Sequence, residues 1–156
     1  MTEVGDALQE RAKMLETTQW ANEFTWKEIE NLSRYLYISK MAKGLAIFNE
    51  GSRNAEMYLI VEGSVNVVKE DVSNREKVLS VITKGKVIGE MALIDGQPRS
   101  AKVVAADDVT MLVLSRDNLD RLIDNIPKLA AKLLLKLGSL ISYKLRMTSG
   151  MLVDYI

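Results

Sequence analysis

The chain begins with apolar residues spaced for one face of a helix. Between charged neighbours, an apolar residue recurs every three or four positions, at Val4, Leu8, Ala12 and Leu15. This spacing predicts an amphipathic helix over roughly residues 4–17. We expect residues 1–22 to form a helical arm that packs on its own domain or contacts a partner subunit. A second helix is expected to start at the capping-box sequence Thr25-Trp26-Lys27-Glu28, which is followed by Ile29, Leu32 and Leu36.

From about Leu45 to Leu114 the pattern alternates with a period of two, and turn residues close each apolar run. The runs lie at residues 57–61, 65–67, 78–82, 102–106 and 109–114. The expected turns are Glu50-Gly51-Ser52, Glu62-Gly63, Lys84-Gly85-Lys86 and Asp107-Asp108, with a polar hairpin tip at residues 71–75. Many short strands at such spacing predict a β-sandwich or a jelly roll.

After residue 114 the helical period returns. Ser115 is expected to cap a helix that carries Leu119 and Leu122, and Pro127 suits the first turn of another helix. From residue 128 onward the apolar stripe consists of Leu129, Leu133, Leu137, Leu140, Ile141 and Leu145, with Lys132, Lys136 and Lys144 outside it. Leu134 and Leu135 widen the apolar arc beyond what one packing face needs. We therefore expect a homodimer through the helix over residues 128–146.

Composition narrows the classes of function. The 156 residues, 47% of them apolar, suit one domain with appendages. Lys plus Arg and Asp plus Glu both number 21, so no net field favours nucleic acid as a partner. The absence of cysteine and histidine excludes disulfides, thiolate chemistry and histidine-based catalysis or zinc binding, and no enzyme is expected. Residues 1–10 resemble neither a signal peptide nor a membrane span, so a cytoplasmic location away from membranes is expected.

One stretch, residues 89–101, concentrates the chemically specific groups. Gly89 would let the backbone approach a ligand closely, and the turn that follows it would point the free N–H groups of residues 91–93 at an anion. Arg99 offers a planar fork of donors for two phosphate oxygens, Ser100 adds a hydroxyl, and the carboxylate of Glu90 suits a sugar hydroxyl. The stretch predicts a pocket for a phosphorylated sugar. Its candidate ligand-binding residues are Gly89, Glu90, Met91, Ala92, Leu93, Pro98, Arg99, Ser100 and Ala101.

This stretch resembles the phosphate-binding cassette of the cyclic nucleotide-binding domain family, in which a Gly-Glu opening, a short Ala-Leu turn and an Arg-Ser-Ala ending hold the ribose and the cyclic phosphate. The turn at residues 50–52 and the run at residues 58–63 resemble the early strands of the same family, so the resemblance covers roughly residues 24–146. It implies a mainly β fold, a jelly roll with N-terminal helices and C-terminal lid helices. Residues 23–146 would form the domain and residues 147–156 a tail. The implied function is a sensor in which the ligand closes the C-terminal helix.

The resemblance also bears on the base. In the family a threonine after the cassette arginine is associated with cyclic GMP, whereas alanine or serine is more usual with cyclic AMP; here the residue is Ser100. Cyclic AMP is therefore the preferred ligand, with cyclic GMP possible. The polar pair that reads adenine in bacterial members falls on Lys144 and Leu145. Leu145 cannot hydrogen-bond, so we expect Lys144 to donate to the base and leucines of the last helix to stack on it.

Two other functions compete with the sensor. An interaction module could keep the fold without the ligand and act through its leucine-rich helices, but a jelly roll has no structural need for Arg99 in a pocket. A jelly-roll metalloenzyme of the cupin type would need clustered histidines. Bacterial regulators of the family carry a helix-turn-helix after the closing helix, and residues 147–156 are too few for one. We therefore expect the sensor to regulate a separate partner protein in trans, or to be a fragment of a longer protein.

Overall fold

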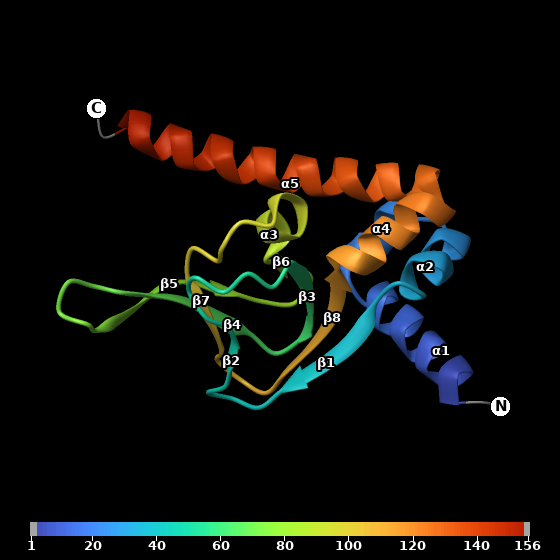
Figure 1. Cartoon of the computed structure of the whole chain (residues 1–156), viewed down its shortest axis with the longest axis horizontal. Helices are drawn as coiled ribbons and strands as arrows, with labels where there is room; N and C mark the ends of the chain where they lie inside the picture. The colour runs from blue at the N-terminus through green and yellow to red at the C-terminus, as the bar shows by residue number, and fades with distance from the viewer. Residues whose placement is uncertain (1–2, 155–156) are drawn as a thin grey trace.

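The computed structural model describes the backbone of residues 3–154 and the side chains of residues 7–148. Within them eight strands form two four-stranded antiparallel sheets (Figure 1). The first has the order β1 (Tyr37–Met41), β8 (Val109–Ser115), β3 (Glu56–Glu62) and β6 (Val87–Ile88). The second has the order β2 (Ala46–Phe48), β7 (Lys102–Ala105), β4 (Val65–Glu70) and β5 (Glu76–Ile82). The helices are α1 (Glu3–Glu16), the 3-10 helix η1 (Gln19–Glu23), α2 (Trp26–Ser33), α3 (Glu90–Asp95), α4 (Arg116–Asn125) and α5 (Pro127–Asp154). The predicted mainly β fold with flanking helices is confirmed.

Local sequence signals set several of these boundaries. The hydroxyl of Thr25 accepts from the Glu28 N–H at 3.2 Å, and the Glu28 carboxylate accepts from the Thr25 N–H at 2.8 Å, so the capping box of α2 is present. Ser115 caps α4 by accepting from the Asn118 N–H at 3.2 Å. At the β4–β5 hairpin tip the Asp71 carboxylate accepts from the Ser73 N–H at 2.8 Å. In α1, Ala12 and Leu15 are buried as expected, whereas the Val4 side chain lies outside the described residues.

Three boundaries differ from the sequence prediction. The β region begins at Tyr37 rather than near Leu45, because β1 is an edge strand that pairs only with β8 and has no clean alternation. Helix α2 ends at Ser33, so Leu36 packs in the core without lying on that helix. The last helix continues to Asp154 instead of ending at residue 146.

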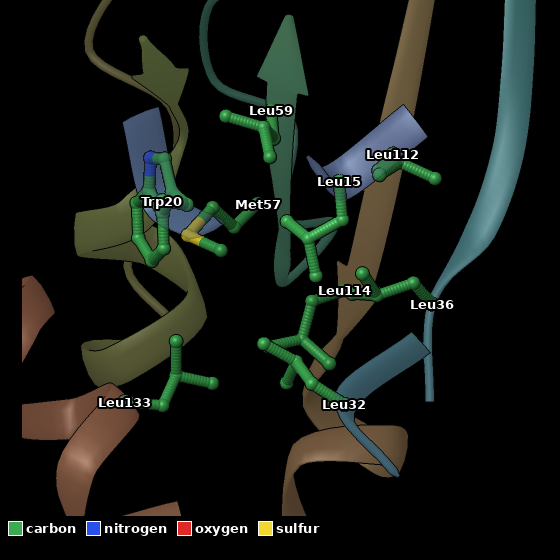
Figure 2. A pocket seen from close by; sticks show the side chains of 9 residues that line it. All are labelled: Leu15, Trp20, Leu32, Leu36, Met57, Leu59, Leu112, Leu114 and Leu133. Carbon is green, nitrogen blue, oxygen red and sulfur yellow. The ribbon is translucent and has the colours of Figure 1, made fainter. Parts of the chain in front are cut away.

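The core has two layers that share β3 and β8. Successive strand residues point to opposite faces of a sheet, so Met57, Leu59 and Val61 face the helices while Tyr58 and Ile60 face the second sheet. This explains the unbroken apolar run at residues 57–61, because both of its faces are buried. The helical layer encloses an apolar cavity of about 20 Å³ (Figure 2). Its lining residues are Leu15, Trp20, Leu32, Leu36, Met57, Leu59, Leu112, Leu114 and Leu133.

Helix α5 is anchored along its first half. Its residues Leu129, Leu133 and Leu137 are buried in the helical layer. Two lysines outside the apolar stripe of α5 also attach this helix to the N-terminal helices. Lys132 Nζ lies 2.9 Å from the Glu28 carboxylate, and Lys136 Nζ lies 2.6 Å from the Glu23 carboxylate.

Beyond this anchor, α5 passes over α3 as a single long helix (Figure 1). Leu140 and Ile141 are half-buried, but Leu135 and Leu145 are 75% and 65% exposed, so Leu145 does not belong to the packed stripe. None of the described helices is both long and apolar enough to cross a membrane.

Candidate ligand-binding site

A cavity of about 430 Å³ lies beside α3, where the end of β6 and the segment leading into β7 meet the second sheet and α5. Nine of the ten predicted residues line it: Gly89, Glu90, Met91, Ala92, Pro98, Arg99, Ser100, Ala101 and Lys144. Leu93 does not. Its side chain is fully buried in the helical layer of the core, because the inner face of α3 packs there. The cavity wall also contains residues that the sequence did not single out: Phe48, Val67, Ser80, Ile82, Val87, Ile88, Asp95, Gln97 and Val103.

The first turn of α3 presents unpaired backbone donors. The Leu93 N–H donates to the Gly89 carbonyl at 3.2 Å, which is the first hydrogen bond of the helix. The N–H groups of Glu90, Met91 and Ala92 precede that bond and have no acceptor within the described part of the chain. The predicted set of amides therefore shifts by one residue, from 91–93 to 90–92. These three donors favour an anion at the start of the turn.

Arg99 is held by the protein on several sides, with only 5% of its surface exposed. Its Nε donates to Asn54 Oδ1 at 3.2 Å, Nη1 to the Gly89 carbonyl at 3.1 Å, and Nη2 to the Glu56 carbonyl at 2.6 Å. The guanidinium also lies 4.1 Å from the centre of the Phe48 ring. A guanidinium has five N–H groups, so two remain after these three bonds. Burial lowers the pKa of Arg99, but an arginine stays charged in proteins.

Gly89 is required for a reason that the sequence did not indicate. Its φ is 80°, in the left-handed region, and a Cβ there would lie 2.5 Å from Arg99 Nη1 and 2.6 Å from the Glu56 carbonyl oxygen. The missing side chain therefore makes room for the arginine and for β3, while the close approach of a ligand to Gly89 stays a prediction.

Glu90 and Lys144 connect the cavity to α5. The Glu90 side chain is buried, and its Oε1 lies 2.5 Å from Lys144 Nζ. Lys144 lines the cavity, but its ammonium contacts the carboxylate expected to bind a sugar, and its donation to a base stays a prediction. Among the described residues of α5 it is the only one in the cavity wall, so none of the described leucines of this helix lines the cavity, and their stacking on a base stays a prediction. Leu145 is largely exposed.

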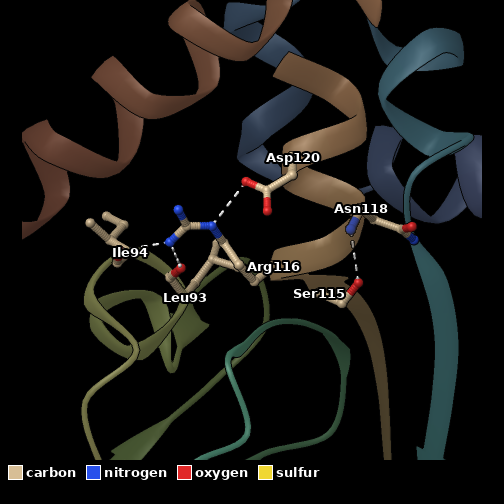
Figure 3. A network of polar contacts seen from close by, with 6 residues as sticks. All are labelled: Leu93, Ile94, Ser115, Arg116, Asn118 and Asp120. Atoms are coloured by element: carbon tan, nitrogen blue, oxygen red, sulfur yellow. Dashed lines mark hydrogen bonds and ion pairs between the residues drawn. The ribbon is translucent and has the colours of Figure 1, made fainter. Parts of the chain in front are cut away.

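The opposite end of α3 is fixed to α4. Arg116, the first residue of α4, donates from Nη1 to the Ile94 carbonyl at 2.9 Å and to the Leu93 carbonyl at 3.3 Å, and its Nε donates to Asp120 at 3.0 Å (Figure 3). These carbonyls are in the last turn of α3, where no further helical N–H follows. A movement of α3 would therefore act on α4 directly.

The geometry agrees with what comparison with known proteins finds. The sequence model for the cyclic nucleotide-binding domain matches residues 38–125. The crystal structure of a cyclic nucleotide-binding domain from Methylobacillus flagellatus kt is similar with a TM-score of 0.80 at 29% identity, covering 97% of this chain and 85% of that one.

Two curated relatives show how varied the similar proteins are. The cyclic AMP receptor protein of Thermus thermophilus is 30% identical over 107 residues, covering 69% of this chain and 50% of the relative. A cGMP-dependent protein kinase of Eimeria tenella is 27% identical over 117 residues, covering 75% of this chain and 11% of the relative. The chain thus spans half or less of the length of these two proteins. Since the family model covers more than half of the chain, and the fold and the cassette agree with it, the chain belongs to the cyclic nucleotide-binding domain family.

Proposed function

We propose that this chain is a regulatory domain that binds a cyclic mononucleotide in the 430 Å³ cavity, with cyclic AMP preferred over cyclic GMP. The observation that carries the proposal is Arg99. It is a buried cation in the wall of a cavity that is also lined by the three residues with free amides in α3, and two of its five N–H groups are not used by its three hydrogen bonds to Asn54, Gly89 and Glu56. Such a set of donors suits a phosphate.

The rest of the cavity suits the remaining parts of a nucleotide. The Glu90 carboxylate accepts hydrogen bonds and would take the ribose hydroxyl, while Arg99 and the amides take the cyclic phosphate. Apolar side chains of the second sheet, including Val67, Ile82 and Val103, provide a surface for the flat face of a base.

Closure of α5 would follow from the Lys144–Glu90 contact. A ribose hydroxyl that bonds to Glu90 must share the carboxylate with Lys144 or displace it, so ligand binding and the position of α5 are linked. The ligand shifts α5 only by the difference in its affinity for the two positions. Because Arg116 ties α3 to α4, the same movement would reach the start of α5.

The direct test is a calorimetric titration of the purified protein with cyclic AMP and cyclic GMP. Arg99→Ala is expected to weaken binding by about 2–4 kcal/mol, and Glu90→Gln, which still accepts from a hydroxyl, by about 1–2 kcal/mol. Circular dichroism of each variant checks that the fold is kept. Wild-type affinity in Arg99→Ala would refute the assignment of the phosphate site.

The base preference rests on Ser100 and is modest. One hydrogen bond gained or lost is worth about 0.5–1.5 kcal/mol, so a threefold to tenfold preference for cyclic AMP is expected. Ser100→Thr should move the ratio of affinities toward cyclic GMP. A competition titration in which cyclic GMP displaces cyclic AMP at equal or lower concentration would overturn this preference.

A homodimer through α5 is the second part of the proposal. The described part of α5 exposes four large side chains, Leu135, Tyr143, Leu145 and Met147, and so has a larger apolar surface than a solvent-facing helix needs. Light scattering at tens of micromolar is expected to report a dimer that Leu135→Glu dissociates. A monomer for the wild-type protein, with and without nucleotide, would contradict it.

The same exposed apolar side chains of α5 support the alternative, an interaction module that binds a partner protein and needs no ligand. Calorimetry distinguishes the two functions, because an interaction module would show no heat of binding with cyclic AMP or cyclic GMP, whereas the regulatory domain would.

A further inference from the structure

The loop between β2 and β3 and the first residue of β3 make hydrogen bonds with both the backbone and the side chain of Arg99. The Gly51 N–H donates to the Arg99 carbonyl and the Arg99 N–H donates to the Ser52 carbonyl, both at 2.8 Å. The same segment supplies Asn54 for Nε and the Glu56 carbonyl for Nη2. Both the backbone and the side chain of Arg99 are therefore placed by residues 51–56.

Asn54 has two chemically different ends, and only one of them can accept from Arg99. Its Oδ1 accepts from Arg99 Nε at 3.2 Å and from the Ser52 hydroxyl at 3.0 Å, while its Nδ2 donates to the Tyr58 hydroxyl oxygen at 3.0 Å. If the amide were turned over, its NH₂ group would face the N–H of Arg99, and two donors would meet. The orientation of this amide thus decides whether Arg99 is held.

Tyr58 and Glu56 set that orientation. The Glu56 carboxylate can only accept, and the Tyr58 hydroxyl donates its single hydrogen to Glu56 Oε1 at 3.3 Å. The oxygen of Tyr58 is then left as an acceptor, so Asn54 must turn its NH₂ group to Tyr58 and its Oδ1 to Arg99. Burial also raises the pKa of Tyr58 to about 12, which keeps the hydroxyl hydrogen in place at neutral pH. Tyr37 donates to the other oxygen of Glu56, and within the described side chains it makes no hydrogen bond to Asn54.

We propose that Asn54 is a positioning residue for the anion-binding Arg99, and that the chain of hydrogen bonds from Glu56 through Tyr58 fixes which end of its amide faces the arginine. Its effect on affinity rests on the proposed function, whereas the hydrogen bonds themselves do not. Asn54 lies 45 residues before Arg99, outside the cassette, so variation here would tune the affinity of the site without any change in the cassette.

Binding of cyclic AMP measured by calorimetry tests the functional half. Asn54→Ala is expected to weaken binding about tenfold, and Tyr58→Phe, which leaves the amide free to turn over, about threefold. Tyr37→Phe is the matched control, since it also removes a tyrosine hydroxyl that donates to the Glu56 carboxylate, and it is expected to leave the affinity unchanged. Equal effects of the two tyrosine variants would overturn the role of Tyr58, and wild-type affinity in Asn54→Ala would overturn the whole proposal.

Nuclear magnetic resonance of the Arg99 Nε–Hε group without nucleotide tests the structural half. In the wild-type protein and in Tyr37→Phe this hydrogen is expected to exchange slowly with water, and in Asn54→Ala and Tyr58→Phe faster. If the wild-type protein binds no cyclic nucleotide, the proposed function fails, but this measurement still decides whether Asn54 positions Arg99. Unchanged exchange in Asn54→Ala would show that it does not.

Discussion

The most selective test of the site's construction is the replacement of Gly89 by alanine. The added Cβ would lie 2.5 Å from Arg99 Nη1 and 2.6 Å from the Glu56 carbonyl oxygen, closer than atoms normally approach. Neither neighbour can yield easily, because one is the backbone of β3 and the other is a buried guanidinium with three hydrogen bonds. The residue would also be held at a φ of 80°, which side chains disfavour.

The expected loss of stability has two parts. A left-handed alanine costs about 1–2 kcal/mol, of which about 0.4–1 kcal/mol is offset by the reduced freedom of the unfolded chain. Displacing Arg99 from the Gly89 carbonyl adds the loss of a charged hydrogen bond, about 1.5–3 kcal/mol. We therefore expect Gly89→Ala to lower the free energy of unfolding by about 2–4 kcal/mol.

Gly96, at the other end of α3, is a matched control. Its φ is 67°, also left-handed, but a Cβ there would meet no atom within 4 Å. Gly96→Ala should thus show the backbone penalty alone, about 1 kcal/mol. Urea denaturation followed by circular dichroism measures both variants, and nucleotide titration should show a loss of affinity only for Gly89→Ala. Equal losses of stability in the two variants would refute the argument that Gly89 makes room for Arg99.

Three further predictions concern the helices. Folding holds the pKa of Glu28 below its ordinary value of 4.5, because the Thr25 N–H donates to the carboxylate and Lys132 adds a second bond. The stability gained is present above about pH 4.5 and is lost as the pH falls through the pKa of the folded protein. Glu28→Gln should therefore reduce the loss of stability measured by urea denaturation between about pH 6 and pH 3, and an unchanged pH dependence would contradict this. Gly138→Ala, in mid-helix with open space around it, should raise stability by about 0.5–1 kcal/mol in thermal denaturation, and a decrease would show an unexpected close contact. Leu133→Ala should enlarge the apolar cavity of the helical layer and lower the free energy of unfolding, measured in urea, by about 2–5 kcal/mol. A decrease of less than about 1 kcal/mol would mean that the helices move together and fill the space.

The cassette was predictable because its chemistry is local. Glu90, Arg99 and Ser100 lie within one short stretch whose turn residues fix their relative positions, so spacing alone indicated a common pocket. The strands could also be predicted from the sequence wherever both faces or alternate faces are buried, as in β3 and β8. Capping at Thr25 and Ser115 is likewise a matter of neighbouring residues.

What the sequence could not supply are the contacts that cross from one element to another. Asn54 and Phe48 hold Arg99 from far earlier in the chain, and neither belongs to a recognisable pattern. Strand β1 was missed because an edge strand is half exposed on both sides and its alternation fades. The sequence predicts that Lys144 contacts the base. In the structure it contacts Glu90, and this contact depends on the angle at which α5 crosses α3, which local spacing does not determine.

The uneven anchoring of α5 gives it the mechanics of a lever. The helix is fixed in the core as far as Leu137 and then continues to Asp154, seventeen residues further on. At 1.5 Å per residue this second part of the helix is about 25 Å long, so a tilt of about 10° at Leu137 would carry Asp154 through roughly 4–5 Å. The contact between Lys144 and Glu90 lies about two fifths of the way along this arm, roughly 10 Å beyond Leu137. A displacement of Lys144 would therefore be a little more than doubled at Asp154, because the arm from Leu137 is about 2.4 times as long to Asp154 as to Lys144.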